Sequence, residues 1–228
     1  MRLKRGALIA LIAAEAWGWL HLLGRTWGST GEERLRYLPG DDLVKDPRLV
    51  TNHATTIRAS AEEIWPWLVQ MGWHRGGWYT YRWVDRLLFP ANAGSADSIL
   101  PEYQDLKVGD RIPDGPPEAD CFYEVKLLEP NKLLVLRSWT HLPKELRRYD
   151  RNRMEWTWAF YLDELAEHET RFLFRVRGNL APVWLRTLYH AAIVSVDFVM
   201  GRSMCLGLKS RVERASGPVV VGLRKQAE

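Results

Sequence analysis

Hydrophobic and polar residues alternate with a period of two through four segments in the second half of the chain. The clearest segment is RMEWTWAFYLDEL, residues 153–165, in which Met154, Trp156, Trp158 and Phe160 share one face. Side chains two residues apart lie on the same face of a strand, so the alternation predicts half-buried β-strands. Their close succession favours antiparallel pairing. The four predicted strands are residues 121–130, 132–139, 153–165 and 170–178.

Helical patterns and one further strand precede this run. Residues 53–60 alternate like a first strand. Ser60 followed by Glu63 is a capping-box signature, which predicts a helix that ends at Gly72. A second predicted helix covers residues 81–89.

A long, mostly apolar helix is predicted after the strands. It begins at Pro182 and ends near residues 216–218, where Ser, Gly and Pro follow one another. A curved antiparallel sheet with one large apolar face needs a cover, and this helix is long enough to supply it. The pattern therefore predicts an α+β fold with a sheet wrapped around a C-terminal helix. The predicted organisation is a helix at 1–26, a linker packed on the domain at 27–50, one domain at 51–216 and a loose tail at 217–228.

The N-terminal segment has the composition of a membrane helix. Basic residues precede the apolar run from Gly6 to Gly24, and this run is close to the roughly 17–25 residues that a spanning helix needs. Glu15 and His21 are costly in hydrocarbon, whereas Trp at its end suits the interface. We expect an uncleaved, membrane-associated helix that spans the bilayer or lies in its interface. The alternative is an amphipathic helix that docks on its own domain, and the side of the membrane stays open.

Charge and composition narrow the partners. The net charge is +4, and no block of five or more like charges occurs, so nucleic-acid binding is not indicated. Twelve Trp residues suit either a core of large planar side chains or a cavity for an apolar guest. Cys121 and Cys205 have no CxxC spacing and are consistent with inert core thiols or with one disulfide.

Five stretches of the chain carry a resemblance to a known family: LPGDDLV, IWPWLVQMG, RGGWYTY, ADSILPEYQDLKVGDRI and DFVMGRSMCLGLKSRVE. Together they resemble the START-like superfamily, also called SRPBCC, which includes polyketide cyclases and lipid-transfer domains. The resemblance covers about residues 27–215 and implies a helix-grip fold with an apolar cavity between sheet and helix. It does not imply one activity, because carriers and enzymes share this scaffold. Two positions depart from the pattern of relatives: Arg82 and Gly201 stand where acidic residues are usual.

Polar residues in two regions are candidates for contacts with a guest. In the C-terminal helix, Arg186, His190 and Asp197 fall on one face, either as a ligand-orienting stripe or as a structural ion pair. The segment Gln70–Trp83 supplies a His, a Trp and two Tyr that either line the cavity entrance or fill the core. The predicted ligand-binding set is His74, Trp78, Tyr79, Tyr81, Trp156, Trp158, Phe160, Arg175, His190 and Asp197.

Metal and phosphate sites are not predicted. The six His residues are scattered without HxxxH or HxH spacing, and the Gly76–Gly77 pair lacks the spacing of a phosphate loop. We therefore expect no metal and no cofactor. The leading hypothesis is a membrane-associated domain that binds an apolar or amphipathic small molecule or lipid. A cyclase- or dehydratase-type enzyme and a partner-binding module with a collapsed cavity are the alternatives, and whether any reaction is catalysed stays open.

Overall fold

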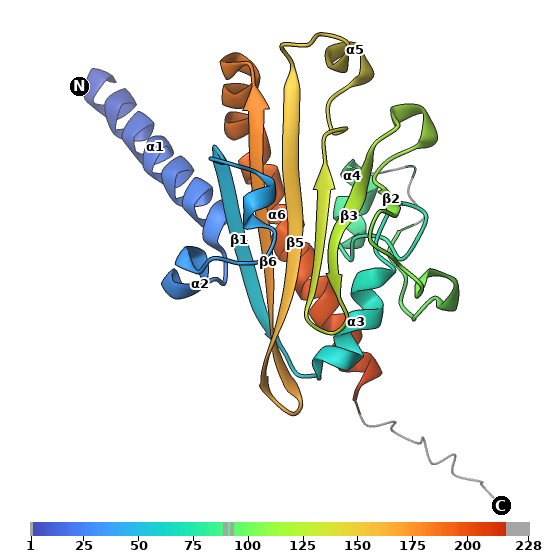
Figure 1. Ribbon diagram of the computed structural model, residues 1–228. Coiled ribbons are helices and arrows are strands. Elements are labelled where there is room, and N and C mark those ends of the chain that lie inside the picture. Colours follow the sequence, from blue (N-terminus) through green and yellow to red (C-terminus); the bar gives the residue numbers. More distant parts are fainter. Residues whose placement is uncertain (1, 89–90, 92–93, 218–228) are drawn as a thin grey trace, which may run out of the picture.

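Six antiparallel strands form one curved sheet in the computed structural model (Figure 1). The strand order is β1-β6-β5-β4-β3-β2, so the first strand pairs with the last one. The structure describes the backbone of residues 2–88, 91 and 94–217, and the side chains of these residues apart from 2–5, 88 and 191–197. The strands are β1 (Leu49–Ile57), β2 (Arg111–Pro113), β3 (Phe122–Glu129), β4 (Leu133–Ser138), β5 (Arg153–Ala166) and β6 (Glu169–Ala181).

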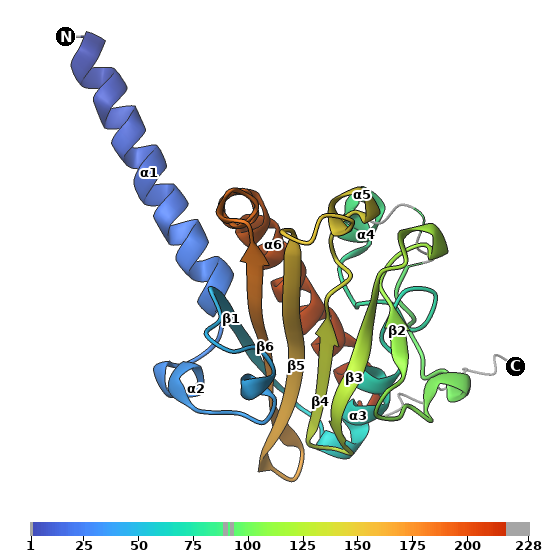
Figure 2. The ribbon, with the colours of Figure 1, turned by 45° about the horizontal axis from the view of Figure 1, so that its top comes forward.

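One long helix, α6, lies along the inner face of this sheet (Figures 1 and 2). It contacts β1, β6 and the short helix α3, and its side chains Cys205, Leu208 and Val212 are fully buried in the main core. The predicted α+β helix-grip fold is confirmed by this arrangement. The helices are α1 (Arg2–Thr26), α2 (Gly31–Leu35), α3 (Ala61–Val69), α4 (Arg82–Leu88), α5 (Lys144–Arg147) and α6 (Val183–Ala215).

The outer face of the sheet is also covered. Residues 37–44 lie across β5 and β6, and Leu38 packs there with Ala159 and Leu173 in a second apolar cluster. The Tyr161 hydroxyl donates to the Pro39 carbonyl at 2.7 Å. Strands β5 and β6 therefore bury side chains on both faces in their middle, which the alternation of hydrophobic residues did not predict.

The element boundaries differ from the sequence predictions in a few places. Strand β1 begins at Leu49 rather than at residue 53, because Leu49 pairs with Gly178 of the long strand β6. The short elements β2, α2 and α5 were not predicted, since three to five residues carry no measurable periodicity. The predicted tail at 217–228 lies outside the described residues from residue 218 onward.

Helix α1 projects away from the domain (Figure 2). Residues Gly6–Thr26 are long and apolar enough to cross a membrane, by length and composition. Residues from Gly6 to Trp19 are exposed, whereas Gly24 is buried and Arg25 donates to the Val50 carbonyl at 3.1 Å. Only the last turns of α1 are thus attached to the domain, on β1 and α6.

Candidate functional site

A small cavity lies between the inner face of the sheet and α6. Its volume is about 30 Å³. That volume holds about one water molecule, whereas pockets for drug-sized ligands measure roughly 300–1,000 Å³. Its walls are mostly apolar and come from β1, β5, β6, α6 and the segment before α4. The lining residues are Thr51, His53, Trp78, Thr80, Trp156, Trp158, Phe174, Val176, Tyr189, Met200, Gly201 and Met204.

Aromatic rings occupy most of the space beneath α6. Trp158 packs edge-on against Trp78 and Phe174, with ring centroids 5.1 and 5.3 Å apart. Trp156 packs edge-on against Tyr189 of α6 at 5.5 Å. Edge-to-face pairs of this kind are favourable contacts, so the aromatic side chains of the protein fill most of the space that a guest would occupy.

Three buried polar atoms in this cavity wall have no hydrogen-bond partner. They are Nδ1 of His53, Nε1 of Trp78 and Nε1 of Trp156. A buried polar group without a partner costs about 1–3 kcal/mol, so such groups usually meet a water or a ligand. The cavity therefore offers one hydrogen-bond acceptor and two donors among apolar walls.

His53 has the strongest electrostatic signature of the site. Burial lowers the pKa of its imidazole to about 4, and a hydrogen bond with the backbone of Gly24 opposes this shift. The ring is therefore neutral near pH 7. With its proton toward Gly24, the imidazole presents Nδ1 to the cavity as an acceptor.

Gly201 of α6 makes room for this ring. A Cβ atom at position 201 would lie 3.0 Å from Cε1 of His53 and 3.1 Å from its Nδ1. The imidazole thus occupies the space that a side chain at position 201 of α6 would need. The replacement of an acidic residue by Gly201 was visible in the sequence, but its link to His53 needs the packing of α6 on β1.

Five of the ten predicted site residues lie in or beside the cavity. Trp78, Trp156 and Trp158 line the cavity. Tyr79 and Phe160 are buried in the core beside it: the Tyr79 hydroxyl donates to the Trp67 carbonyl at 2.7 Å, and Phe160 is fully buried. Burial raises the pKa of Tyr79 far above its ordinary range.

Arg175 was predicted to contact a guest, but it does not line the cavity. It lies on the outer face of β6, where its Nη1 contacts Asp41 Oδ2 at 2.7 Å and its Nε donates to Asn52 at 2.7 Å. Its guanidinium also donates to the carbonyls of Glu33 and Arg36. Arg175 therefore attaches the segment before β1 to the sheet.

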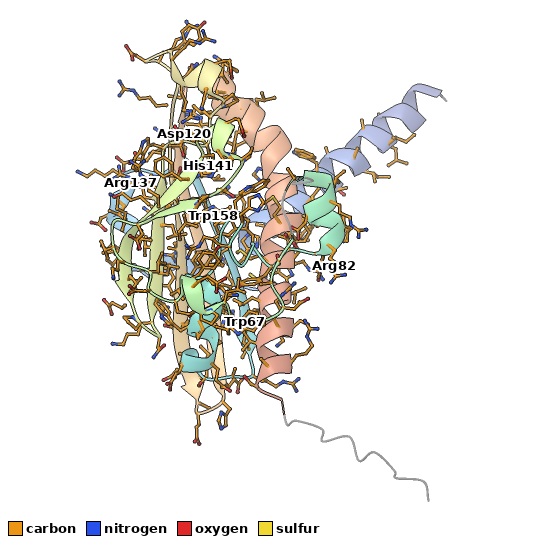
Figure 3. The ribbon with its side chains drawn as sticks, turned by 90° about the vertical axis from the view of Figure 1, so that its right-hand side faces the viewer. Trp67, Arg82, Asp120, Arg137, His141 and Trp158 are labelled. Carbon is orange, nitrogen blue, oxygen red and sulfur yellow. The ribbon has the colours of Figure 1, made fainter. Side chains whose placement is uncertain are left out.

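Other predicted residues lie elsewhere. His74 and Tyr81 are exposed, so neither contacts a guest in this cavity. His190 faces α1, with its ring 6.2 Å from that of His21. The side chain of Asp197 lies outside those that the structure describes. Arg82 points away from the sheet on α4 and is exposed (Figure 3).

A second group of chemically active side chains lies at one end of the sheet. Ligand atoms of Asp114, Cys121 and His141 lie within 4.8 Å of one another. Burial, and then the nearby Asp114 charge, raise the pKa of the Cys121 thiol to about 12. The sequence predicted no metal site because these residues have no characteristic spacing, and only the sheet brings them together.

Comparisons with known proteins find similar solved structures but no similar sequence. No family model and no curated protein matches the sequence. Similar solved structures include a START superfamily protein from Mycobacterium smegmatis, at 14% identity and a TM-score of 0.38 over 73% of this chain and 99% of that chain. The Zhui aromatase/cyclase from a Streptomyces species has 14% identity and a TM-score of 0.38, over 73% and 94%. Norcoclaurine synthase from Thalictrum has 13% identity and a TM-score of 0.41, over 73% and 95%.

The chain thus has a START-like helix-grip fold, as its own sheet order and C-terminal helix define it. The resemblance predicted from the sequence is confirmed at the level of this fold. Similarity at these identities extends to architecture alone, so function has to be argued from the cavity.

Proposed function

We propose that this protein binds an apolar small molecule with a hydroxyl-like polar group between its sheet and α6, at a membrane. The observation that supports this is the unpartnered set His53 Nδ1, Trp78 Nε1 and Trp156 Nε1 in an otherwise apolar wall. A hydroxyl can donate to His53 and accept from an indole, while the apolar part of the guest contacts the aromatic rings.

Binding such a guest requires the cavity to open, because about 30 Å³ holds only one water. The C-terminal half of α6 is anchored by fully buried residues such as Leu208. Its N-terminal half is more exposed, with Trp184 and Leu188 each more than half accessible. We expect opening at this half, which lies beside α1 (Figure 1).

The membrane is the expected source of the guest. Helix α1 exposes Leu, Ile and Trp side chains along its free part, and Val183, Trp184 and Leu188 of α6 are exposed near its attachment. Exposed apolar surface of this kind favours a membrane or an apolar partner over water. A guest that leaves the bilayer beside α1 reaches the loosely covered half of the cavity first.

The cavity supports binding better than acid–base catalysis. Such catalysis usually needs two titratable groups within reach of the reacting atoms. The titratable groups among the described lining residues are the His53 imidazole and the Tyr189 phenol, and no carboxylate lies there to act with His53 as an acid or base. The predicted partners His74 and His190 lie outside the cavity, which leaves binding as the function that the described residues favour.

Two measurements test the proposal. Native mass spectrometry of the full chain extracted from membranes should show a co-purified apolar molecule, and a fluorescent long-chain alcohol should bind and quench Trp emission. Trp156→Phe keeps an aromatic side chain but removes Nε1, and should weaken binding of the alcohol about two- to tenfold, as expected for one hydrogen bond. Trp83→Phe is the matched control, because Trp83 is exposed, and should leave binding unchanged.

A chain that carries no apolar molecule and does not take up the alcohol would contradict the proposal. That result would favour the partner-binding module with a closed cavity. Equal affinities of Trp156→Phe and the unmodified chain would show that binding occurs outside the cavity.

A further inference from the structure

Three strand ends bring Asp114, Cys121 and His141 together. Asp114 follows β2, Cys121 precedes β3, and His141 comes after β4. Neighbouring strands run antiparallel, so the end of β2, the start of β3 and the end of β4 lie side by side at the same end of the sheet. One ligand atom of each residue lies within 4.8 Å of the other two. Figure 3 shows His141 at this end, with Trp158 nearer the middle of the sheet.

Hydrogen bonds of the backbone and of the Thr140 hydroxyl hold the cluster in place. The Asp114 amide donates to the Cys121 carbonyl at 2.9 Å, which continues the pairing of β2 with β3. The Phe122 amide donates to Thr140 Oγ1 at 2.9 Å, and Thr140 Oγ1 donates to the Phe122 carbonyl at 3.0 Å. The strand ends therefore fix the Cα positions of all three candidate ligands.

The His141 ring is oriented by groups on both of its nitrogens. Nδ1 lies 2.6 Å from the Ser138 hydroxyl, and Nε2 lies 2.7 Å from Asp114 Oδ2. Its ring centroid is 4.5 Å from that of Tyr123. A His residue that binds a metal usually donates its other ring N–H to an oxygen acceptor. The Ser138 hydroxyl on Nδ1 can take this role, which leaves Nε2 for the metal.

We propose that Asp114, Cys121 and His141 bind a divalent transition-metal ion, with zinc as the best match. Thiolate, imidazole and carboxylate together are the ligand types that zinc prefers. The Cys121 thiol releases its proton to solvent on binding, and the metal replaces the hydrogen bond between His141 Nε2 and Asp114. Thiolate and carboxylate charges then balance the ion, which suits a half-buried site.

The observed spacing is close to that of a zinc site. Bonds of about 2.0–2.3 Å to a tetrahedral ion place ligand atoms roughly 3.3–3.8 Å apart. The distance of 2.7 Å between His141 Nε2 and Asp114 Oδ2 has to widen, whereas separations of up to 4.8 Å have to shorten. Rotations of the Asp114 and Cys121 side chains can supply both changes. The same residues line a groove of about 630 Å³, so a fourth ligand can enter from solvent. This site lies beside the proposed guest cavity, since the His141 ring is 5.1 Å from that of Trp156.

Cobalt is a direct probe of this site. The full chain, without a polyhistidine tag and treated with chelator, is titrated with Co²⁺. We expect one equivalent to bind with a near-ultraviolet thiolate-to-cobalt charge-transfer band, and Zn²⁺ should then abolish the band. Cys121→Ser should remove the band, whereas Cys205→Ser should retain it, because Cys205 is fully buried in α6.

Ser138 provides a finer test. Ser138→Ala removes the hydroxyl that lies on His141 Nδ1, and it leaves all three proposed metal ligands unchanged in the sequence. We expect Co²⁺ affinity to fall about 10- to 100-fold with the same band and stoichiometry, as for other residues that orient a metal-binding His. Circular dichroism of each variant confirms that it folds.

Several outcomes would overturn the proposal. A titration of the unmodified chain that shows no charge-transfer band does so by itself, even if a variant fails to fold. A band that survives in folded Cys121→Ser, or that is lost in folded Cys205→Ser, assigns the metal to another place. In either case Asp114 and His141 form only a structural pair that joins β2 to β4.

Discussion

At the scale of single residues, His53 and Gly201 form the most unusual pair in the molecule. The buried imidazole faces the guest cavity, and the glycine removes the side chain that would displace it. This pairing makes the stability of the fold depend on pH. Burial lowers the pKa of His53 in the folded chain to about 4, below its ordinary value of 6.5.

The sign of this dependence follows from the lowered pKa. Between pH 6.5 and 4, the unfolded chain binds a proton at His53 that the folded chain excludes, so stability falls as pH falls through this window. The contribution present above pH 6.5 is about 3 kcal/mol, at about 1.4 kcal/mol per pKa unit. His53→Gln should therefore weaken the pH dependence of the free energy of unfolding between pH 7 and pH 4.5, as measured by urea denaturation at each pH. His168→Gln, at an exposed turn, is the control and should keep the slope of the unmodified chain.

Arg175 makes a second prediction at this scale. Arg175→Ala should lower the free energy of unfolding by about 3–5 kcal/mol, because the buried Asp41 carboxylate loses the nearer of its two ion-pair partners and keeps only Arg177 at 3.6 Å. Arg36→Ala removes the exposed pair with Asp163 and should cost less than about 1 kcal/mol. Chemical denaturation measures both. Equal losses would show that Arg175 does not anchor the outer segment.

At the scale of elements, the contact of α6 with the segment before α4 depends on Gly207. A Cβ atom at this position would lie 1.8 Å from the Tyr79 carbonyl oxygen. Both partners are backbone, so Gly207→Ala forces α6 away from this segment, and we expect a loss of more than about 2 kcal/mol in the free energy of unfolding. Gly18→Ala in α1, where no atom lies within 4 Å, should leave the unfolding of the domain unchanged.

Local patterns predicted most elements and only part of the site. The strands β3 to β6 were predicted because their alternation extends over six residues or more, and α6 because a long apolar stretch lies between Pro182 and residues 216–218. The face of a strand could not be assigned where both faces are covered, which is why Arg175 was placed in the cavity. His53 and the cluster of Asp114, Cys121 and His141 were missed, since their environments depend on pairings between distant segments.

At the scale of the whole molecule, α1 and the domain are joined over a few residues. Removing residues 2–19 deletes residues that are exposed wherever their side chains are described, from Gly6 to Trp19, so the shortened chain should fold with an unchanged unfolding midpoint. We expect it to leave the membrane fraction and appear in the supernatant after centrifugation. Removing residues 2–27 should also destabilise the domain, because Arg25 contacts Val50 and the Trp27 carbonyl accepts from Ala54.

The fraction of shortened chain that stays on membranes separates two contributions. Complete release assigns attachment to α1. Retention of the folded, shortened chain would contradict that assignment and point to Trp184 and Leu188 of α6 instead.

The pairing of β1 with β6 also has a consequence for biosynthesis. Leu49 pairs with Gly178, so β1 leaves the ribosome long before its only neighbour in the sheet is made. At about 5–20 residues per second, that interval is on the order of ten seconds. During it, α1 is already available to a membrane while β1 has an unpaired edge. Recruitment of the nascent chain to a bilayer would therefore precede closure of the sheet and hold that edge away from other chains.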